Sequence, residues 1–356
     1  MLRKKLDQVK KQIEDHLGNI LDQESEKAAQ INPAFQKQYQ AFSHFVLNGG
    51  KRLRAALVMQ GAQAAQSRVK REIVYDLAAA IELIHAFLII QDDVFDRDQT
   101  RRGRPTLYRL FAQNQSRLRL NALNAERIGQ AQAFISSDLA FNLSIKLVNQ
   151  AHIEANKKQR ILEQMNDSLF HTLAGESLDL NVNDQNLTQT QILNIYMLKT
   201  AKYTFENPLL IGLALGQSKK QLERGLANYA MNLGVAYQIK DDLIGIFSSK
   251  KELGKDIGSD IQEGKQTLLT RKMLIASKPA EKRKLEQMIQ RKQTPDQKEL
   301  DFYKQLAHST KALHDCEAKS QALIKQAKLE LKALKLPTKT QEFLLALADY
   351  VLNRKY

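Results

Sequence analysis

The chain has 356 residues, of which only 15 are glycine and 6 are proline, well below the average usage of the two residues together. This scarcity of helix breakers argues against all-β and collagen-like folds, and the 43% hydrophobic share argues against wholesale disorder. A formal net charge of +15 suggests a polyanionic partner, which the charge alone leaves open among nucleic acid, a lipid surface and a phosphorylated substrate.

The single cysteine, Cys316, excludes an internal disulfide framework and a cysteine-rich zinc site, which suits a reducing compartment. The start of the chain is charged throughout and lacks the apolar segment of a signal peptide. The longest apolar run, Leu77–Ile90, is interrupted by Glu82 and His85 and is too short to span a bilayer. We therefore expect a cytoplasmic protein without stable membrane insertion.

Apolar residues recur at spacings of three and four along nearly the whole chain, whereas alternating β-type runs are hard to find. No fixed-period repeat and no Pro-, Gly- or Ser-rich linker divides the sequence, so we expect one all-α domain over residues 1–356. In residues 271–356, 19 Lys or Arg outnumber 10 Asp or Glu. Apolar positions separate these bases as on a solvated helix face, which predicts a basic helical C-terminal segment.

The first motif along the chain is GGKRLRAAL, in which Lys51 and Arg54 lie three residues apart after Gly49 and Gly50. We expect a helix to open here, and two bases at a helix start suit a phosphate group. Taken by itself, the motif fits a solvated charged turn about as well.

The next motif, HAFLIIQDDVFDRDQTRRGRP, ends an apolar helical run in four aspartates. Asp92 and Asp96 are four residues apart and project from one helix face, where they repel each other unless a cation lies between them. Carboxylates completed by water and substrate phosphate are ligands that Mg²⁺ prefers. His85 lies two helical turns before Asp92 and points in nearly the same direction. The alternative is the polar end of a core helix with an interior histidine.

The segment MLKTAKYTFENPLL places Lys199 and Thr200 on a helix that we expect Asn207 and Pro208 to interrupt. Carbonyl groups freed by the interruption, together with the Thr200 hydroxyl, would be available near a cationic centre.

A second acidic pair, Asp241 and Asp242, again ends an apolar helical stretch, and Gln238 shares its face. Lys255 and Lys265 follow in glycine-flanked loops, where backbone amides are free to meet anions.

The duplication strengthens the functional interpretation. Each acidic pair is followed by bases, namely Arg101 and Arg102 after the first pair and Lys255 and Lys265 after the second. Each of the two apolar helices ends in carboxylates with bases nearby. This combination suits a site that holds metal ions and phosphate together.

Taken together, these motifs resemble the trans-isoprenyl diphosphate synthases. That family is marked by GGKRLR, DDxxD followed by RRG, a KT pair, and a second DD motif followed by spaced GK elements, all found here in family order over residues 41–270. The ending FLLALADYVLNRK is similar to family C-terminal helices, though less specifically. The resemblance implies an all-α helical bundle of the isoprenoid-synthase type around a deep central cavity, a homodimer, and Mg²⁺ as cofactor. It also implies two substrates, isopentenyl diphosphate and an allylic diphosphate (dimethylallyl, geranyl or farnesyl).

Residue roles follow from the resemblance position by position. The implied metal ligands are Asp92, Asp93 and Asp96 on one wall and Asp241 and Asp242 on the opposite wall. The implied ligands of the allylic diphosphate are Lys199, Lys255, Lys265 and Arg101. The implied ligands of isopentenyl diphosphate are Lys51, Arg54, His85 and Arg102. Oxygen dipoles facing the developing carbocation would come from Thr200 and Gln238.

The sequence departs from the family pattern at a few positions. Gly245 stands where the second motif often has a third aspartate, which removes that position from the metal assignment. Gln91 replaces a common histidine before the first DD, and Ala55 replaces the usual proline after GGKRLR. Phe87 and Leu88, a turn or more before Asp92, are bulky as in short-chain members. They predict farnesyl or, preferably, geranylgeranyl diphosphate as product, unless Phe87 only packs in the core and the floor lies elsewhere.

Three other functions compete with this one. A class I terpene cyclase shares the DDxxD motif but binds one diphosphate and has no need of GGKRLR and His85. A non-catalytic partner subunit of a heteromeric polyprenyl diphosphate synthase would lose aspartates, whereas both pairs are intact here. A nucleic-acid binder is disfavoured because no patch interleaves bases with aromatic residues, so we expect no nucleic-acid partner.

Overall fold

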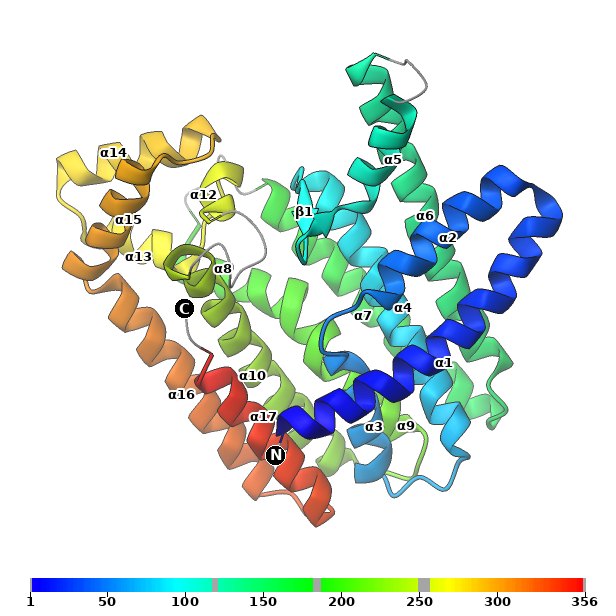
Figure 1. Ribbon diagram of the computed structural model, residues 1–356. Coiled ribbons are helices and arrows are strands. Elements are labelled where there is room, and N and C mark those ends of the chain that lie inside the picture. The colour runs from blue at the N-terminus through cyan, green and yellow to red at the C-terminus, as the bar shows by residue number, and fades with distance from the viewer. Residues whose placement is uncertain (1, 117–120, 182–186, 249–256, 355–356) are drawn as a thin grey trace. The chain divides into compact units, whose positions relative to one another are not determined.

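The computed structural model describes residues 2–116, 121–181, 187–248 and 257–354. Within these ranges the regular secondary structure is helical apart from one two-stranded hairpin, which confirms the expected all-α class (Figure 1). The fold has two compact units, the first formed by Met1–Leu162 and Ile211–Gln217, the second by Glu163–Leu210 and Ser218–Tyr356. The expectation of a single domain over residues 1–356 stays a prediction.

The first unit starts with two antiparallel helices that lie side by side, α1 (Leu2–Ile31) and α2 (Pro33–Leu47) (Figure 1). The turn between them is fixed by Asn32, whose side chain caps α2 by accepting a hydrogen bond of 2.7 Å from the Ala34 amide. Pro33 stands at the first helical position, where its missing N–H costs nothing. The other elements lying wholly in this unit are α3 (Leu53–Ala64), α4 (Arg71–Phe95), β1 (Thr100–Arg101), β2 (Arg104–Pro105), α5 (Leu107–Ser116) and α6 (Ala122–Gln150).

Helix α4 is the central helix of the first unit and packs against α3 and α6. Its apolar positions are buried nearly all round, as expected for a core helix. With 25 residues it exceeds the apolar run that the sequence suggested, so by length and composition alone it could cross a membrane. Its most apolar window is 72% buried inside the protein, as in the core helix of a soluble protein.

The hairpin that follows α4 was not anticipated from the sequence. Thr100 pairs with Pro105 and Arg101 with Arg104, which leaves Arg102 and Gly103 as a two-residue loop. Both loop residues have positive φ, 53° and 74°, as a type I′ turn requires. The strands are too short for an alternating pattern to be visible in the sequence.

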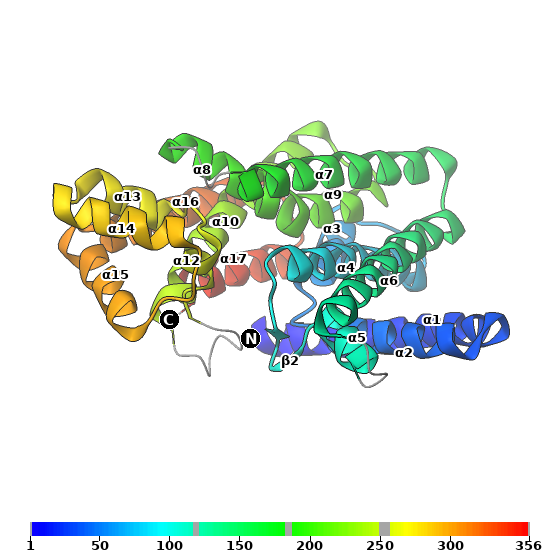
Figure 2. The same cartoon turned by 90° about the horizontal axis from the view of Figure 1, so that it is seen from above.

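The second unit contains the following complete elements: α8 (Gln189–Tyr196), the π-helix η2 (Met197–Glu206), α10 (Lys220–Phe247), α12 (Ser259–Glu263), α13 (Leu268–Ala276), α14 (Pro279–Arg291), α15 (Gln297–Ser309), α16 (Ala312–Lys332) and α17 (Thr338–Leu352). Helix α10 packs against η2 and α16, and the close approach to η2 depends on Gly234. A Cβ atom there would lie 2.5 Å from the Cα atom of Ala201. Helices α13, α14 and α15 lie beside one another (Figure 2).

Two helices, α7 (Ala155–Asn181) and α9 (Asn207–Ala214), contribute residues to both units. The expected interruption of the helix at Asn207 and Pro208 is not found, because η2 continues directly into α9 at Asn207, which has helical φ and ψ of −59° and −46°. The wider π-helical turns end at Glu206, and Pro208 stands in the first turn of α9, where a proline is tolerated.

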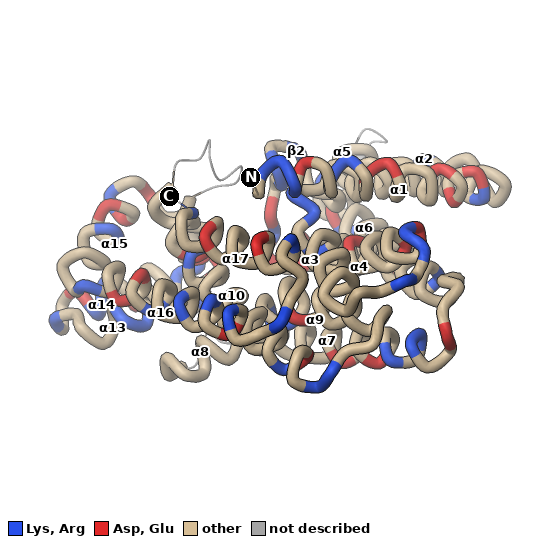
Figure 3. The backbone as a smooth tube through the Cα atoms, turned by 90° about the horizontal axis from the view of Figure 1, so that it is seen from below, with Lys and Arg blue, Asp and Glu red and all other residues tan. Residues whose placement is uncertain are grey.

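In the described part of the C-terminal segment, residues 271–354, the expected helices are found, from the second half of α13 to α17. Lys and Arg are interspersed with Asp and Glu along α14 and α15 (Figure 3). This distribution is that of a solvated helix surface carrying both signs of charge.

Candidate active site

The first acidic motif lies where α4 ends. Asp92 and Asp93 belong to its last turn, and Asp96 caps the helix by donating its backbone N–H to the Asp92 carbonyl at 2.8 Å. The side chain of Asp93 is 1% exposed and accepts a 2.5 Å hydrogen bond from Nε of Arg101. The same guanidinium reaches Asp92 at 3.3 Å and Asp98 at 3.4 Å. The β1–β2 hairpin therefore returns a base to the acids that precede it.

Burial sets the electrostatics of this motif. It raises the pKa of Asp93 to about 7, against the opposing effect of the Arg101 guanidinium. Oδ2 of Asp93 is buried and has no hydrogen-bond partner among the described residues. A carboxylate oxygen that accepts no hydrogen bond can instead serve as a ligand of a divalent cation, which prefers oxygen ligands.

A basic cluster surrounds His85, in the middle of α4. Burial lowers the pKa of His85 well below its usual value, and the nearby guanidinium groups of Arg54 and Arg102 lower it further. Arg102 also donates a 2.7 Å hydrogen bond to the Asn48 carbonyl, while Lys51 is exposed just before α3. The imidazole is therefore neutral at physiological pH and lies among positive charges, as in an anion-binding site.

The two residues predicted to limit product length, Phe87 and Leu88, are half-buried on α4. The Phe87 ring lies 5.4 Å from the ring of Phe141 on α6, and the Phe87 carbonyl accepts a 3.1 Å hydrogen bond from Ser137. Phe141 is a further aromatic residue at this place that the sequence did not reveal.

The second acidic motif is held differently, near the end of α10. Asp241 is half-exposed and accepts a 2.7 Å hydrogen bond from the Arg354 guanidinium, which also lies over the Tyr237 ring. Asp242 is buried, and its two oxygens accept hydrogen bonds from Gln238, at 2.8 Å, and from the Tyr196 hydroxyl. The contact between Gln238 and Asp242 agrees with the predicted shared helix face.

The hydrogen bonds around Asp242 continue into neighbouring elements. Thr200 on η2 donates to the Gln238 side-chain carbonyl at 2.6 Å. The Tyr196 hydroxyl in turn accepts a 2.8 Å bond from the Leu268 amide at the start of α13. Burial raises the pKa of Asp242 well above its usual value, and so does Asp260, although the hydrogen bonds from Tyr196 and Gln238 oppose the shift. Thr200 and Gln238 thus lie within hydrogen-bond distance of each other, while their expected role opposite a carbocation stays a prediction.

Asp260 lies close to Gly245, the position where the second motif lacks a third aspartate. A Cβ atom on Gly245 would lie 3.7 Å from Oδ2 of Asp260. An acid from α12 therefore stands next to the position that has lost one on α10. No local pattern predicts this proximity, because Asp260 follows Gly245 by 15 positions and part of the stretch between them lies outside the described ranges.

The predicted lysines have acidic neighbours in the second unit. Nζ of Lys199 lies 2.7 Å from Asp179 and 2.9 Å from Glu176 on α7. Lys265 forms an ion pair with Glu263. Lys255 lies outside the described residues.

Several groups that the motifs did not reveal contact the predicted site residues or hold the segments that carry them: Arg52, Glu82, Glu176, Asp179, Tyr196, Asp260 and Arg354. Arg52 was visible inside GGKRLR, and Arg354 inside the weakly similar ending, but the other groups lie in stretches without a motif. In the described parts of the chain, no group of three or more His, Cys, Asp or Glu could hold a metal ion.

The sequence model of the polyprenyl synthetase family matches residues 35–306, which is most of the chain. The chain belongs to the polyprenyl synthetase family. As a polyprenyl synthetase it is an enzyme, a trans-isoprenyl diphosphate synthase, and the expected family and fold are confirmed. The comparisons favour this function over a terpene cyclase or a non-catalytic partner subunit.

Individual relatives of this polyprenyl synthetase agree with the family match. It is 28% identical to a short chain isoprenyl diphosphate synthase of Methanocaldococcus jannaschii, over 78% of this chain and 79% of the relative. It is 30% identical to a geranylgeranyl diphosphate synthase of Sulfolobus acidocaldarius, over 69% and 70% of the two chains. A crystal structure of geranylgeranyl pyrophosphate synthase from Corynebacterium glutamicum, complexed with isoprenyl diphosphate and magnesium, superposes with a TM-score of 0.93 at 26% identity, covering 98% and 99%.

Proposed function

We propose that this polyprenyl synthetase condenses isopentenyl diphosphate with an allylic diphosphate, head to tail and in trans, to give a short-chain product. The observation that carries the proposal is the pair of aspartate motifs. One motif lies at the end of the apolar helix α4 and the other near the end of α10. In each motif an aspartate pairs with an arginine of the same unit. Acids and bases held together in this way suit ligands that combine a metal ion with a diphosphate.

The proposed cofactor is Mg²⁺. Asp92, Asp93 and Asp96 would hold it in the first unit, and Asp241 and Asp242 would hold a further ion in the second unit. All are oxygen donors, and the buried Oδ2 of Asp93 has acceptor capacity that no described residue uses. When bound, the ion would neutralise charge on a departing diphosphate.

The two diphosphates would be held by different bases. We assign isopentenyl diphosphate to the basic cluster around the neutral His85: Lys51, Arg54 and Arg102. The sequence resemblance assigns the allylic diphosphate to Arg101, Lys199, Lys255 and Lys265, of which Lys255 lies outside the described residues. Glu176 and Asp179 would hold the Lys199 ammonium in place for its ligand.

In the proposed reaction the C–O bond of the allylic diphosphate breaks, and the diphosphate leaves with the electron pair. The double bond of isopentenyl diphosphate attacks the allylic cation, a C–C bond forms, and a proton is lost to the released pyrophosphate. The hydroxyl oxygen of Thr200 and the amide oxygen of Gln238 would face the cation as fixed dipoles, because their mutual 2.6 Å hydrogen bond orients both groups.

The proposed product is geranylgeranyl diphosphate, with farnesyl diphosphate as the shorter alternative. Support comes from the bulky pair Phe87 and Leu88 on α4, with Phe141 packed against Phe87. The printed names of the relatives, short-chain isoprenyl and geranylgeranyl diphosphate synthases, agree with a short product. The proposal includes a homodimer and a cytoplasmic location.

The test is a product assay with the purified chain, Mg²⁺, labelled isopentenyl diphosphate and each allylic primer in turn. We expect turnover that depends on both substrates and on Mg²⁺, with geranylgeranyl diphosphate as the main product. Cyclic hydrocarbons formed without isopentenyl diphosphate would instead identify a terpene cyclase. No activity until a second chain is added would identify a partner subunit.

Product length has its own test. Phe87→Ala should shift the products to longer chains, because it removes an aromatic ring from the proposed floor. The matched variant Phe141→Ala removes the ring that packs against it and should lengthen products less. An unchanged product distribution for Phe87→Ala would show that the ring only fills the core.

A further inference from the structure

Arg52 stands between two predicted diphosphate ligands, Lys51 and Arg54, yet it does not share their surroundings. Its side chain is 3% exposed, whereas Lys51 is exposed. Its backbone is left-handed, with φ of 51° and ψ of 42°, at the residue that precedes α3. A large charged side chain is rarely buried, and a non-glycine residue rarely adopts this conformation, so the surrounding structure must hold both features in place.

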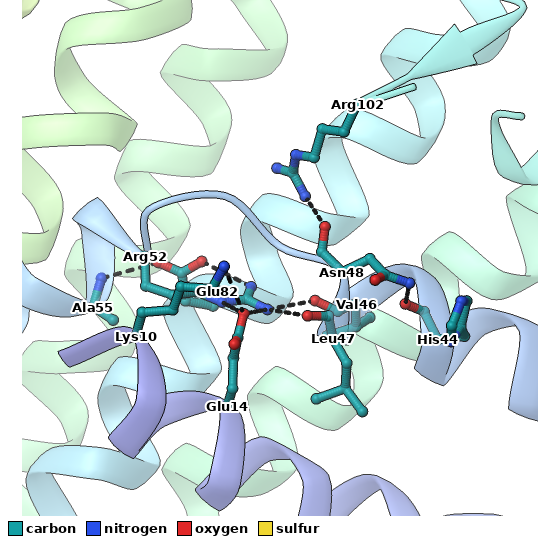
Figure 4. Close-up of polar contacts among 10 residues, drawn as sticks. All are labelled: Lys10, Glu14, His44, Val46, Leu47, Asn48, Arg52, Ala55, Glu82 and Arg102. Carbon is teal, nitrogen blue, oxygen red and sulfur yellow. Dashed lines mark hydrogen bonds and ion pairs between the residues drawn. The ribbon is translucent and has the colours of Figure 1, made fainter. Parts of the chain in front are cut away.

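The guanidinium of Arg52 is held from several elements at once (Figure 4). Nη1 lies 3.3 Å from Oε2 of Glu82 on α4, and Nη2 lies 3.2 Å from Oε1 of Glu14 on α1. Nη2 also donates to the carbonyls of Val46, at 2.6 Å, and Leu47, at 3.3 Å, where α2 ends. One side chain therefore connects the last turn of α2 to α1 and α4.

Glu82 connects this arrangement to the start of α3. Its side chain is 3% exposed, and while Oε2 pairs with Arg52, Oε1 accepts a 3.0 Å hydrogen bond from the Ala55 amide. That amide is one of the first-turn donors that a helix cannot satisfy by itself. The Glu82 carboxylate thus fixes the Arg52 guanidinium relative to the Ala55 amide, and Arg54 lies between these two residues in the sequence.

The loop before Arg52 is fitted closely to this guanidinium. A Cβ atom on Gly49 would lie 2.0 Å from Cζ of Arg52, so only glycine allows the approach. From another direction Arg102 donates to the Asn48 carbonyl at 2.7 Å, and its guanidinium lies 3.5 Å from the place of a Cβ on Gly50. The backbone of residues 48–52 is therefore held by a buried arginine and by a second, exposed one.

We propose that Arg52 is a positioning residue for isopentenyl diphosphate binding. Its guanidinium, anchored by Glu82 and Glu14, fixes the backbone that carries Lys51 and Arg54. The inference rests on the proposed function of those two bases, and it gives α1 a role at the site through Glu14. Fixing two flexible bases before the ligand arrives lowers the entropy lost on binding.

The main test compares Arg52→Met with wild type. We expect KM for isopentenyl diphosphate to rise about tenfold or more, while kcat and KM for the allylic substrate stay within about threefold of wild type. The reason is that a misplaced anion site weakens the binding of one substrate equally in the ground state and the transition state. Arg52→Lys keeps the charge but cannot form the forked contacts, so it should recover only part of the affinity. Lys10→Met is the matched control, because Lys10 lies 4.0 Å from the same Glu14 but contacts no part of the loop in the described structure. It should leave both KM values unchanged.

A binding measurement separates this inference from the proposed function. Titration calorimetry with isopentenyl diphosphate alone should show weaker binding by Arg52→Met even if wild type has no turnover. If wild type binds but does not turn over, the proposed reaction is wrong and the positioning role is still tested. If Arg52→Met folds poorly, Glu14→Gln keeps the buried Glu82 pair and should raise the same KM and Kd severalfold. Equal losses for both substrates, or lower thermal stability with both KM values and the Kd unchanged, would overturn the proposal.

Discussion

The two aspartate motifs of this enzyme are built from the same residue types but are held in opposite ways. In the first motif the buried acid, Asp93, is paired with a guanidinium, that of Arg101. In the second motif the buried acid, Asp242, accepts hydrogen bonds from neutral groups, and the arginine contacts the half-exposed Asp241 instead. Sequence similarity between two DD pairs therefore does not imply similar electrostatics.

The difference follows from what the chain places next to each pair. A tight hairpin returns Arg101 to α4 within a few residues, so a charge-assisted contact forms locally. Near α10 the neighbours of Asp242 are Tyr196 and Gln238, whose hydrogen bonds fix the carboxylate without neutralising it. We infer that the first motif depends on a charge for its stability and that the second depends on hydrogen-bond geometry.

The largest effect is expected from Arg101→Met. At a pH well above 7, where Asp93 is ionised, it would leave this buried carboxylate without its positive partner, which typically costs about 3–5 kcal/mol of unfolding free energy. Arg101 is also a proposed ligand of the allylic diphosphate, so activity should fall as well. Urea unfolding in the absence of substrates measures the stability change.

The matched control for that variant is Arg104→Met. Arg104 stands opposite Arg101 in the same hairpin but is exposed and contacts His44. Its loss should change the unfolding free energy by less than about 0.5 kcal/mol, as is usual for surface positions. Equal destabilisation by the two variants would mean that the hairpin, and not the buried charge pair, accounts for the loss.

A smaller effect is expected from Tyr196→Phe. The variant removes the hydroxyl that donates to Asp242 and accepts from the Leu268 amide, and unsatisfied buried groups of this kind cost about 1–3 kcal/mol. We also expect kcat to fall, because Asp242 is no longer held on both oxygens. Thermal unfolding and steady-state kinetics on one preparation check both outcomes.

Tyr229→Phe distinguishes stability from function in this comparison. The Tyr229 hydroxyl is also buried in the second unit and donates a 2.8 Å bond to the Leu344 carbonyl, but it contacts no aspartate in the described structure. Its loss should lower stability by a similar amount and leave kcat unchanged. If kcat falls equally in both tyrosine variants, Tyr196 has no special role at the second motif.

The sequence predicted the features of this site that depend on local spacing. Few glycines and prolines predicted the helices, and the four-residue spacing predicted that Gln238 and Asp242 would share a face. It could not predict the contact between Tyr196 and Asp242, because 46 residues separate them and periodicity reports only which face of one helix is apolar. Nor could it predict the buried side chain of Arg52, since nothing in GGKRLR distinguishes it from the neighbouring bases.

The π-helix η2 illustrates a second limit of sequence reasoning. Asn207 and Pro208 predicted an interruption, but the chain passes from η2 into α9 without one. Proline lacks a backbone hydrogen-bond donor, but Pro208 stands in the first turn of α9, where a proline is tolerated. Which of two helical solutions forms depends on packing, here of η2 against α10, and packing is not visible in a local pattern.

The smallest effect is expected from Arg354→Gln, which removes the positive partner of Asp241. Because Asp241 is half-exposed, the ion pair contributes at most about 1 kcal/mol, and unfolding should change little. If Asp241 binds Mg²⁺, however, Arg354 competes with the ion for the same carboxylate. The variant should then reach half-maximal activity at a Mg²⁺ concentration about two- to fivefold lower, the factor that such a pair energy allows. A higher Mg²⁺ requirement would instead show that Arg354 supports the metal-bound state. The arginine of the second motif would then assist its acid in the same way as Arg101 assists the acids of the first motif.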